Sequence, residues 1–125
     1  MDYQNTKLPL ILNKIAQELR QQNDKWWRDP LTNECIFRNR PEMMMLMVSE
    51  IAEAMEGYRK NLQDDHLPQF PMETVEFADL FIRMMDYVGE HCPQFGEAVV
   101  AKLEYNQHRA DHTNAVRLAE GGKKF

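Results

Sequence analysis

Residues 72–89, METVEFADLFIRMMDYVG, decide the fold of this chain. At the roughly 100° per residue of an α-helix, apolar side chains cover most of the circumference of this segment. The charged side chains gather in one narrow stripe, formed by Glu76, Asp79, Arg83 and Asp86. A surface helix has a broad polar face, so we expect this helix to be mostly buried and its charged stripe to face an enclosed cleft. The pattern predicts a helix over residues 72–88 that stops at Gly89.

A second segment, residues 41–60, repeats this pattern. It opens with Pro41, which suits the first position of a helix, and is broadly apolar except for Glu50 and Glu53 on one shoulder. Residues 64–71 contain two prolines and break the helical pattern, so the two helices are expected to run antiparallel. Each helix then presents a pair of carboxylates at spacing i, i+3, which places the two members of a pair on one face.

The two carboxylate pairs favour a metal site. A single E-x-x-E pattern is most often a solvated helix face, but two pairs on two mostly apolar helices are harder to explain in that way. Converging carboxylates repel one another and are costly to bury unless a cation offsets their charge. Hard divalent ions, Mg²⁺ with Mn²⁺ as a substitute, prefer such oxygen ligands together with water and phosphates.

The rest of the chain predicts an all-α fold, a four-helix, bundle-like core within a single domain. Apolar spacing predicts further helices over residues 6–24 and from Pro93 to Arg109, joined to the central pair by an irregular loop at residues 25–40. Residues 110–125 are expected to form a mobile tail. With 125 residues the chain is small for burying a large core alone, so we expect a homodimer or homotetramer.

Composition excludes several classes of protein. The net charge of −5 argues against nucleic-acid binding and against a polybasic membrane binder. No apolar run approaches the roughly 20 residues that a membrane span needs. Cys35 and Cys92 have no metal-ligand spacing, and no signal sequence precedes them. We therefore expect a cytoplasmic protein with free thiols, in the host cytoplasm if the chain is viral.

The sequence Glu50-Ile-Ala-Glu53, then 22 residues, then Glu76-Phe-Ala-Asp79 resembles the E-x-x-E…E-x-x-D signature of the all-alpha nucleoside triphosphate pyrophosphohydrolases. This group includes MazG-like proteins, dimeric dUTPases and phosphoribosyl-ATP pyrophosphohydrolases. The resemblance covers residues 42–109, and the compact length is most similar to phage and bacterial MazG-like members. It implies a hydrolase that cleaves (d)NTP to (d)NMP and pyrophosphate, with purine deoxynucleotides such as dGTP favoured.

The resemblance also implies roles for individual residues. Glu50, Glu53, Glu76 and Asp79 would hold Mg²⁺, and Glu50 and Glu53 would be catalytic. The motif does not settle which carboxylate is the general base, and we favour Glu53.

Residues on the fourth expected helix are the candidates for binding phosphate. Lys102, Tyr105, Asn106 and Arg109 form one stripe, and the family carries a similar K-x-x-x-N arrangement near the phosphates. The alternative for this stripe is a solvated basic edge. Arg83 either touches phosphate or pairs with Glu76 and Asp86, and we favour the pairing.

Three other features are weaker. Trp26 and Trp27 are candidates for stacking on the nucleobase, although a core or interface role is the commoner one for tryptophan. Met43, Met44, Met45 and Met47 indicate helical core or an oligomer interface rather than a binding surface. His112, Lys123 and Lys124 either close over phosphates or belong to an unstructured basic end.

Alternative functions remain open from the sequence. Within the class, a dUTPase or dCTPase that acts on pyrimidine nucleotides is possible. Outside it, the chain would be a non-catalytic helical interaction module whose acidic stripes bind a basic partner. A di-metal oxidase is set aside, because such proteins use E-x-x-H pairs and no histidine follows any of the four carboxylates at that spacing.

Overall fold

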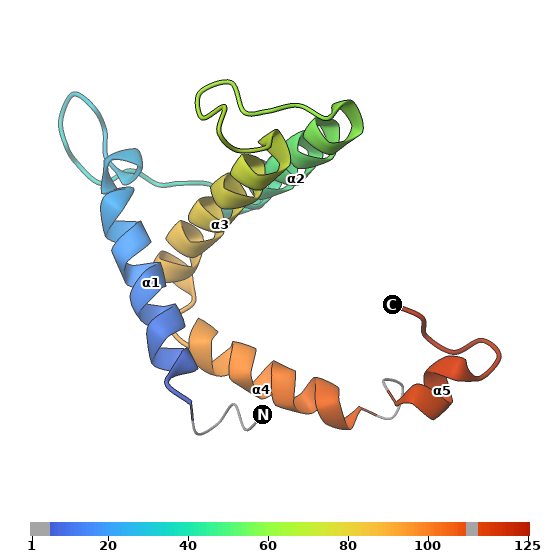
Figure 1. Cartoon of the computed structure of the whole chain (residues 1–125). Helices are drawn as coiled ribbons and strands as arrows, with labels where there is room; N and C mark the ends of the chain where they lie inside the picture. Colours follow the sequence, from blue (N-terminus) through green and yellow to red (C-terminus); the bar gives the residue numbers. More distant parts are fainter. Residues whose placement is uncertain (1–5, 110–112) are drawn as a thin grey trace. The chain divides into compact units, whose positions relative to one another are not determined.

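The computed structural model describes residues 6–109 and 113–125, and the all-α prediction is confirmed for them. The elements are α1 (Leu8–Gln22), a short 3₁₀ helix η2 (Asp24–Trp27), α2 (Arg40–Lys60), α3 (Met72–His91), α4 (Phe95–His108) and α5 (Asn114–Leu118), as Figure 1 shows. Within the described ranges no strand is present, and β-type pairing is limited to two isolated bridges, Arg28 with Cys35 and Gln63 with Pro71. None of these helices has the length and apolar character that a membrane crossing requires.

The chain packs as two compact units, which are described separately. The central unit is Ile15–Cys92, and the terminal unit combines Met1–Lys14 with Pro93–Phe125. All the predicted metal ligands lie in the central unit. The prediction of a single domain stays a prediction.

The pairing of α2 with α3 forms the body of the central unit, and the two helices lie side by side in Figure 1. At the start of α2, the Asn39 side chain accepts a hydrogen bond from the Glu42 N–H, and Pro41 occupies the first turn. The helix ends at Asn61, whose φ of 53° is left-handed. The 64–71 break therefore has the expected place, between two antiparallel helices.

The end of α3 differs from the prediction. The helix does not stop at Gly89 but continues to His91. A Cβ at residue 89 would lie 2.5 Å from the Ala16 carbonyl oxygen, so this glycine permits close approach of α1 to α3 rather than ending the helix. Gln17 donates a hydrogen bond to the Gly89 carbonyl oxygen at 3.3 Å, and Arg20 pairs with Glu90 at 2.6 Å. These contacts fix the second half of α1 against α3.

A small core lies beneath the loop that joins α1 to α2. Trp27, Met43 and Tyr87 are buried together, with Met47 and Cys92 packed against them. Met85 is fully buried nearby on α3. The segment predicted as loop therefore contributes η2 and one of the largest core side chains.

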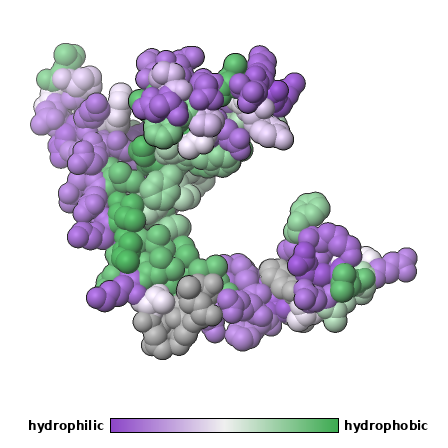
Figure 2. All heavy atoms as spheres, viewed as in Figure 1, coloured by the Kyte–Doolittle hydropathy of each residue, from purple (hydrophilic) through white to green (hydrophobic). Residues whose placement is uncertain are grey.

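The terminal unit is organised around Asn13 of α1. Its amide donates to Glu97 at 2.7 Å and accepts from the Gly96 N–H at 2.8 Å, which satisfies a backbone donor at the start of α4. Figure 2 shows that α1 is amphipathic, with a column of hydrophobic side chains running beside hydrophilic ones. The segment expected to be a mobile tail contains α5, whose first turn is capped by the Thr113 hydroxyl. His112 lies outside the described residues.

Candidate metal centre

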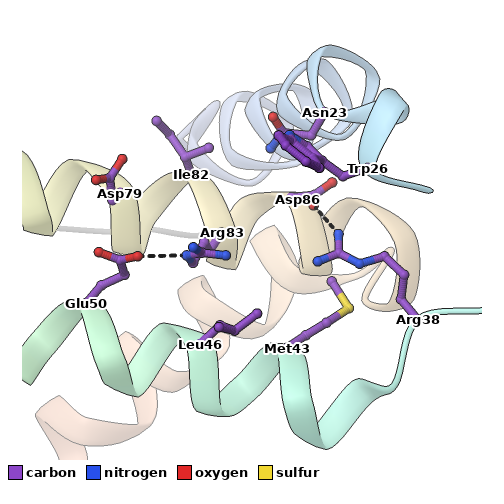
Figure 3. A pocket seen from close by; sticks show the side chains of 10 residues that line it. All are labelled: Asn23, Trp26, Arg38, Met43, Leu46, Glu50, Asp79, Ile82, Arg83 and Asp86. Carbon is purple, nitrogen blue, oxygen red and sulfur yellow. Dashed lines mark hydrogen bonds and ion pairs between the residues drawn. The ribbon is translucent and has the colours of Figure 1, made fainter. Parts of the chain in front are cut away.

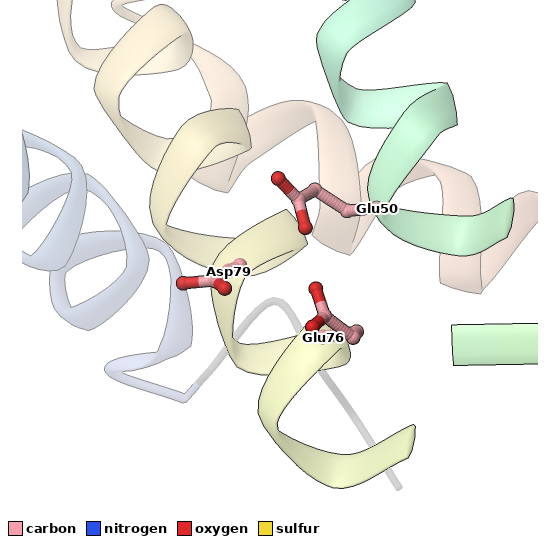
Figure 4. A group of neighbouring side chains, drawn as sticks. All are labelled: Glu50, Glu76 and Asp79. Atoms are coloured by element: carbon pink, nitrogen blue, oxygen red, sulfur yellow. The ribbon is translucent and has the colours of Figure 1, made fainter. Parts of the chain in front are cut away.

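Three of the four predicted ligands converge between α2 and α3. One carboxylate oxygen from each of Glu50, Glu76 and Asp79 lies within 4.8 Å of the others. Figure 4 shows Glu50 extending from α2 toward Glu76 and Asp79 on α3. Glu50 and Glu76 are only 6% and 8% exposed, whereas Asp79 is exposed at the edge. The fourth residue, Glu53, is exposed and interacts with both Glu50 and Glu76.

The buried carboxylates are incompletely satisfied. Glu50 Oε1 accepts from Arg83 Nε at 2.8 Å, but Glu50 Oε2 and Glu76 Oε2 are buried and have no hydrogen-bond partner among the described residues. A buried unpaired polar oxygen costs free energy, and two from facing helices are exceptional. The arrangement provides unused oxygen ligands in the position where the sequence predicts a cation.

The electrostatics of the cluster reflect this crowding. Burial, hydrogen bonds that Glu76 can donate to Glu50 and Glu53 only when it is protonated, and the charges of both raise the pKa of Glu76 to about 8. Burial and the charge of Glu50 also raise the pKa of Asp79, with Arg83 opposing. Burial opposes ionisation of Glu50, yet hydrogen bonds with Glu76 and Arg83 hold its pKa below the ordinary value. In the metal-free cluster near neutral pH, a proton held by Glu76 therefore offsets part of the negative charge of the carboxylates, as a bound cation would.

A cleft of about 440 Å³ extends from this cluster along α3 (Figure 3). Ten residues line it: Asn23, Trp26, Arg38, Met43, Leu46, Glu50, Asp79, Ile82, Arg83 and Asp86. Three members of the predicted charged stripe thus face the cleft. Glu76 lies buried beside it.

The prediction that Arg83 pairs with Glu76 and Asp86 is wrong. Arg83 pairs with Glu50 of α2 rather than with Glu76 or Asp86 of its own helix. Asp86 instead accepts from Trp27 Nε1 at 2.9 Å and pairs with Arg38 at 3.4 Å. Both side chains reach across to another element, which spacing along a single helix does not reveal.

The two tryptophans have different environments. Trp27 is buried, and the guanidinium carbons of Arg20 and Arg38 lie 4.4 and 4.9 Å from its ring centroid. Its ring is therefore not available to a nucleobase in this structure. Trp26 is 61% exposed and lines the cleft, so the stacking prediction rests on Trp26 alone.

The predicted phosphate-binding stripe forms on α4. The Lys102 ammonium lies 4.8 Å and the Arg109 guanidinium 5.8 Å from the centroid of the Tyr105 ring, so these three side chains share one face. Asn106 is half-buried, and its Oδ1 has no partner among the described residues. The stripe belongs to the terminal unit, and its contact with phosphate stays a prediction. In the tail, Lys124 donates to the Arg117 carbonyl oxygen, while Lys123 is exposed.

Arg38 and Asn23 also line the cleft, although the sequence pattern does not predict this position for them. Both lie outside the α-helices, where there is no periodicity to indicate which way a side chain points. The only available signal was a pair of arginines, Arg38 and Arg40, immediately before an apolar helix in an acidic chain.

Comparisons with protein-family models, with curated proteins and with solved structures give no significant match to this chain. The family resemblance therefore rests on the motif residues themselves.

Proposed function

We propose that the chain is a metal-dependent nucleoside triphosphate pyrophosphohydrolase with the all-alpha, MazG-like fold, which converts (d)NTP to (d)NMP and pyrophosphate. The observation that carries the proposal is the convergence of Glu50, Glu76 and Asp79 within 4.8 Å at one end of a cleft. Carboxylates arranged in this way suit a hard divalent cation, and such cations in turn bind phosphate.

The chemistry of the ligand set fits Mg²⁺, with Mn²⁺ as a substitute. Two buried carboxylate oxygens, from Glu50 and Glu76, have no partner among the described residues and are free to coordinate. A bound cation would oppose the rise in the pKa of Glu76 that burial and the neighbouring carboxylates cause, because it favours the ionised carboxylate. Glu50, Glu76 and Asp79 would hold the ion, and the neighbouring Glu53 would complete the set.

Residues in and beside the cleft would carry out the remaining steps of the chemistry. When bound, Mg²⁺ supplies charge for the phosphate oxygens and lowers the pKa of a coordinated water. Glu53 is exposed beside the buried pair, so we assign its carboxylate as the general base that takes the proton from the attacking water. Arg83 is oriented by Glu50 and lines the cleft, where its guanidinium would stabilise negative charge on the phosphates. Lys102, Tyr105, Asn106 and Arg109 lie in the terminal unit, and their role as phosphate-binding candidates rests on the family resemblance alone.

The proposal includes a homodimer or homotetramer. On α2, Met43 is buried, but six large hydrophobic side chains are exposed: Met44, Met45, Val48, Ile51, Met55 and Tyr58. Contiguous apolar surface of this kind is unfavourable in water and commonly marks an interface. Light scattering at several protein concentrations tests the oligomer independently of the chemistry.

The experiment that tests the function is pyrophosphate release from the eight common ribo- and deoxyribonucleoside triphosphates, with Mg²⁺ or Mn²⁺. We expect cleavage of one or a few substrates, its loss in Glu53→Ala, and its retention in Glu56→Ala. Glu56 is the matched control because it lies on the same helix and pairs only with Lys60 and Arg59 among the described residues. Preference for dUTP or dCTP would favour the pyrimidine alternative. No release above that of Glu53→Ala would reject the enzyme and favour a helical interaction module.

A further inference from the structure

The cleft has a second end, which the proposed chemistry does not use. Asp86 follows Asp79 by seven residues on α3, so the two lie about 10 Å apart along the helix at 1.5 Å per residue. Around Asp86 the cleft is lined by Asn23, Trp26 and Arg38, as Figure 3 shows. This end thus combines an exposed aromatic ring with a guanidinium and an amide.

Arg38 is held in place but not saturated. Its Nη1 lies 3.4 Å from Asp86 Oδ2, and its guanidinium carbon lies 4.9 Å from the Trp27 ring centroid. Asp86 is itself fixed, because its other oxygen accepts from Trp27. Among the described residues, the Arg38 guanidinium has no other hydrogen-bond acceptor, although its side chain is only 20% exposed. The remaining N–H groups form a positioned, planar fork in the wall of the cleft.

Phosphate is a poor occupant for this end of the cleft. The Asp86 carboxylate is a wall of the same space and would repel a phosphate group. The phosphates also have a better site about 10 Å away, where the carboxylate cluster would hold a cation. A nucleotide anchored there and lying along the cleft would place its base beside Trp26 and Arg38, which line the same cleft.

We propose that Arg38 selects the base of the nucleotide by donating two parallel hydrogen bonds to adjacent acceptors on the base edge, and so favours guanine. This inference rests on the proposed function and names its substrate class. Guanine presents N7 and O6 side by side, which suits an arginine fork. Adenine and cytosine place an amino donor at this edge, which would face the Arg38 donors, and thymine or uracil offers a single carbonyl oxygen.

The kinetic test compares kcat/KM for dGTP, dATP, dUTP and dCTP in the wild type, Arg38→Lys and Arg38→Gln. Arg38→Lys keeps the charge beside Asp86 but loses the fork, so we expect the dGTP value to fall about 10- to 100-fold and the dATP value to change little. Arg38→Gln should shift preference toward dATP, because an amide side chain pairs with N6 and N7 of adenine. Arg28→Gln is the matched control, since Arg28 lies in the same loop but outside this cleft. An equal loss for all four substrates would overturn the proposal, because it would indicate a structural or phosphate-binding role.

A binding experiment separates this proposal from the proposed function. Guanosine and adenosine carry no phosphate, so their binding in EDTA, followed by tryptophan fluorescence, needs neither cation nor hydrolysis. We expect the wild type to bind guanosine at least about tenfold tighter than adenosine, because one bidentate pair with the base is worth about this much. We expect Arg38→Lys, which loses that pair, to bind the two nucleosides equally. If the protein prefers guanosine but hydrolyses no nucleoside triphosphate, the role of Arg38 in base selection stands and the proposed enzymatic activity is rejected. Hydrolysis with no Arg38-dependent base preference would reject the role of Arg38 and sustain the enzyme.

Discussion

Two buried acids on α3, Glu76 and Asp86, have opposite surroundings. Asp86 is 4% exposed and receives hydrogen bonds from Trp27 and Arg38, which counter the rise in its pKa that burial causes. Glu76 is 8% exposed, faces Glu50 and Glu53, and keeps one oxygen without a partner among the described residues. A buried charge that the protein satisfies supports the structure, whereas one left unsatisfied indicates a ligand. We therefore assign Asp86 to the framework of the cleft and Glu76 to its chemistry.

The largest expected effect is on activity, in Glu76→Gln. This change keeps the size of the side chain but removes a carboxylate that we propose as a metal ligand. We expect pyrophosphate release to fall by at least about 100-fold, because even residues that only support metal ligands are worth 10- to 100-fold. Thermal stability of the metal-free protein should not fall, since a glutamine stays neutral beside Glu50 and Glu53 without having to bind a proton. Glu73→Gln on the exposed first turn of α3 is the control, and loss of stability in Glu76→Gln would place Glu76 in the framework instead.

Asp86→Ala should lower the stability of the fold, unlike Glu76→Gln. It leaves the Trp27 indole N–H and the Arg38 guanidinium without their acceptor, and we expect a loss of about 3 kcal/mol in the free energy of unfolding. Urea denaturation of the metal-free protein measures this. A variant as stable as the wild type would mean that Asp86 does not support the cleft.

Trp27→Phe tests the same network more gently. The aromatic ring remains between Arg20 and Arg38, but its hydrogen bond to Asp86 is lost. We expect destabilisation of about 1–2 kcal/mol, smaller than in Asp86→Ala because Arg38 still pairs with the carboxylate. Trp26→Phe on the exposed neighbour should change stability little, so equal losses in the two variants would contradict the distinction between these tryptophans.

The smallest expected effect is the pH dependence of the metal-free protein. The pKa of Glu76 is raised from 4.5 to about 8, so between these values the native state holds a proton that the unfolded chain has released. Stability therefore falls as pH rises from about 5 to about 9, and Glu76→Gln removes much of the slope. The lowered pKa of Glu50 acts below this window. Thermal melts across the range measure it, and identical slopes in the two proteins would show that Glu76 does not titrate as described.

Patterns within one element predicted much of this structure. The 3.6-residue period located α2 and α3, and the i, i+3 carboxylate pairs located Glu50, Glu76 and Asp79. Gly89 was misread as a helix end because a glycine that permits close helix packing has the same sequence signal as one that terminates a helix. The error has a physical origin, since only the tertiary contact with Ala16 distinguishes the two cases.

Contacts between elements were not predictable from the sequence. The partners of Arg83 and Asp86 lie on α2, η2 and the following loop, and no local spacing encodes them. Arg38 was missed for the same reason. Its position in the cleft depends on how the segment between η2 and α2 folds over Trp27. The sequence therefore predicted the carboxylate cluster better than the residues that shape the cleft around it.

The most direct test of the central claim is calorimetric titration of Mn²⁺ into the wild type, Glu76→Gln and Glu56→Gln. We expect saturable binding to the wild type and to Glu56→Gln, with binding to Glu76→Gln weakened by at least about tenfold. No saturable binding to the wild type, or equal binding to all three proteins, would contradict the assignment of Glu50, Glu76 and Asp79 as a metal centre.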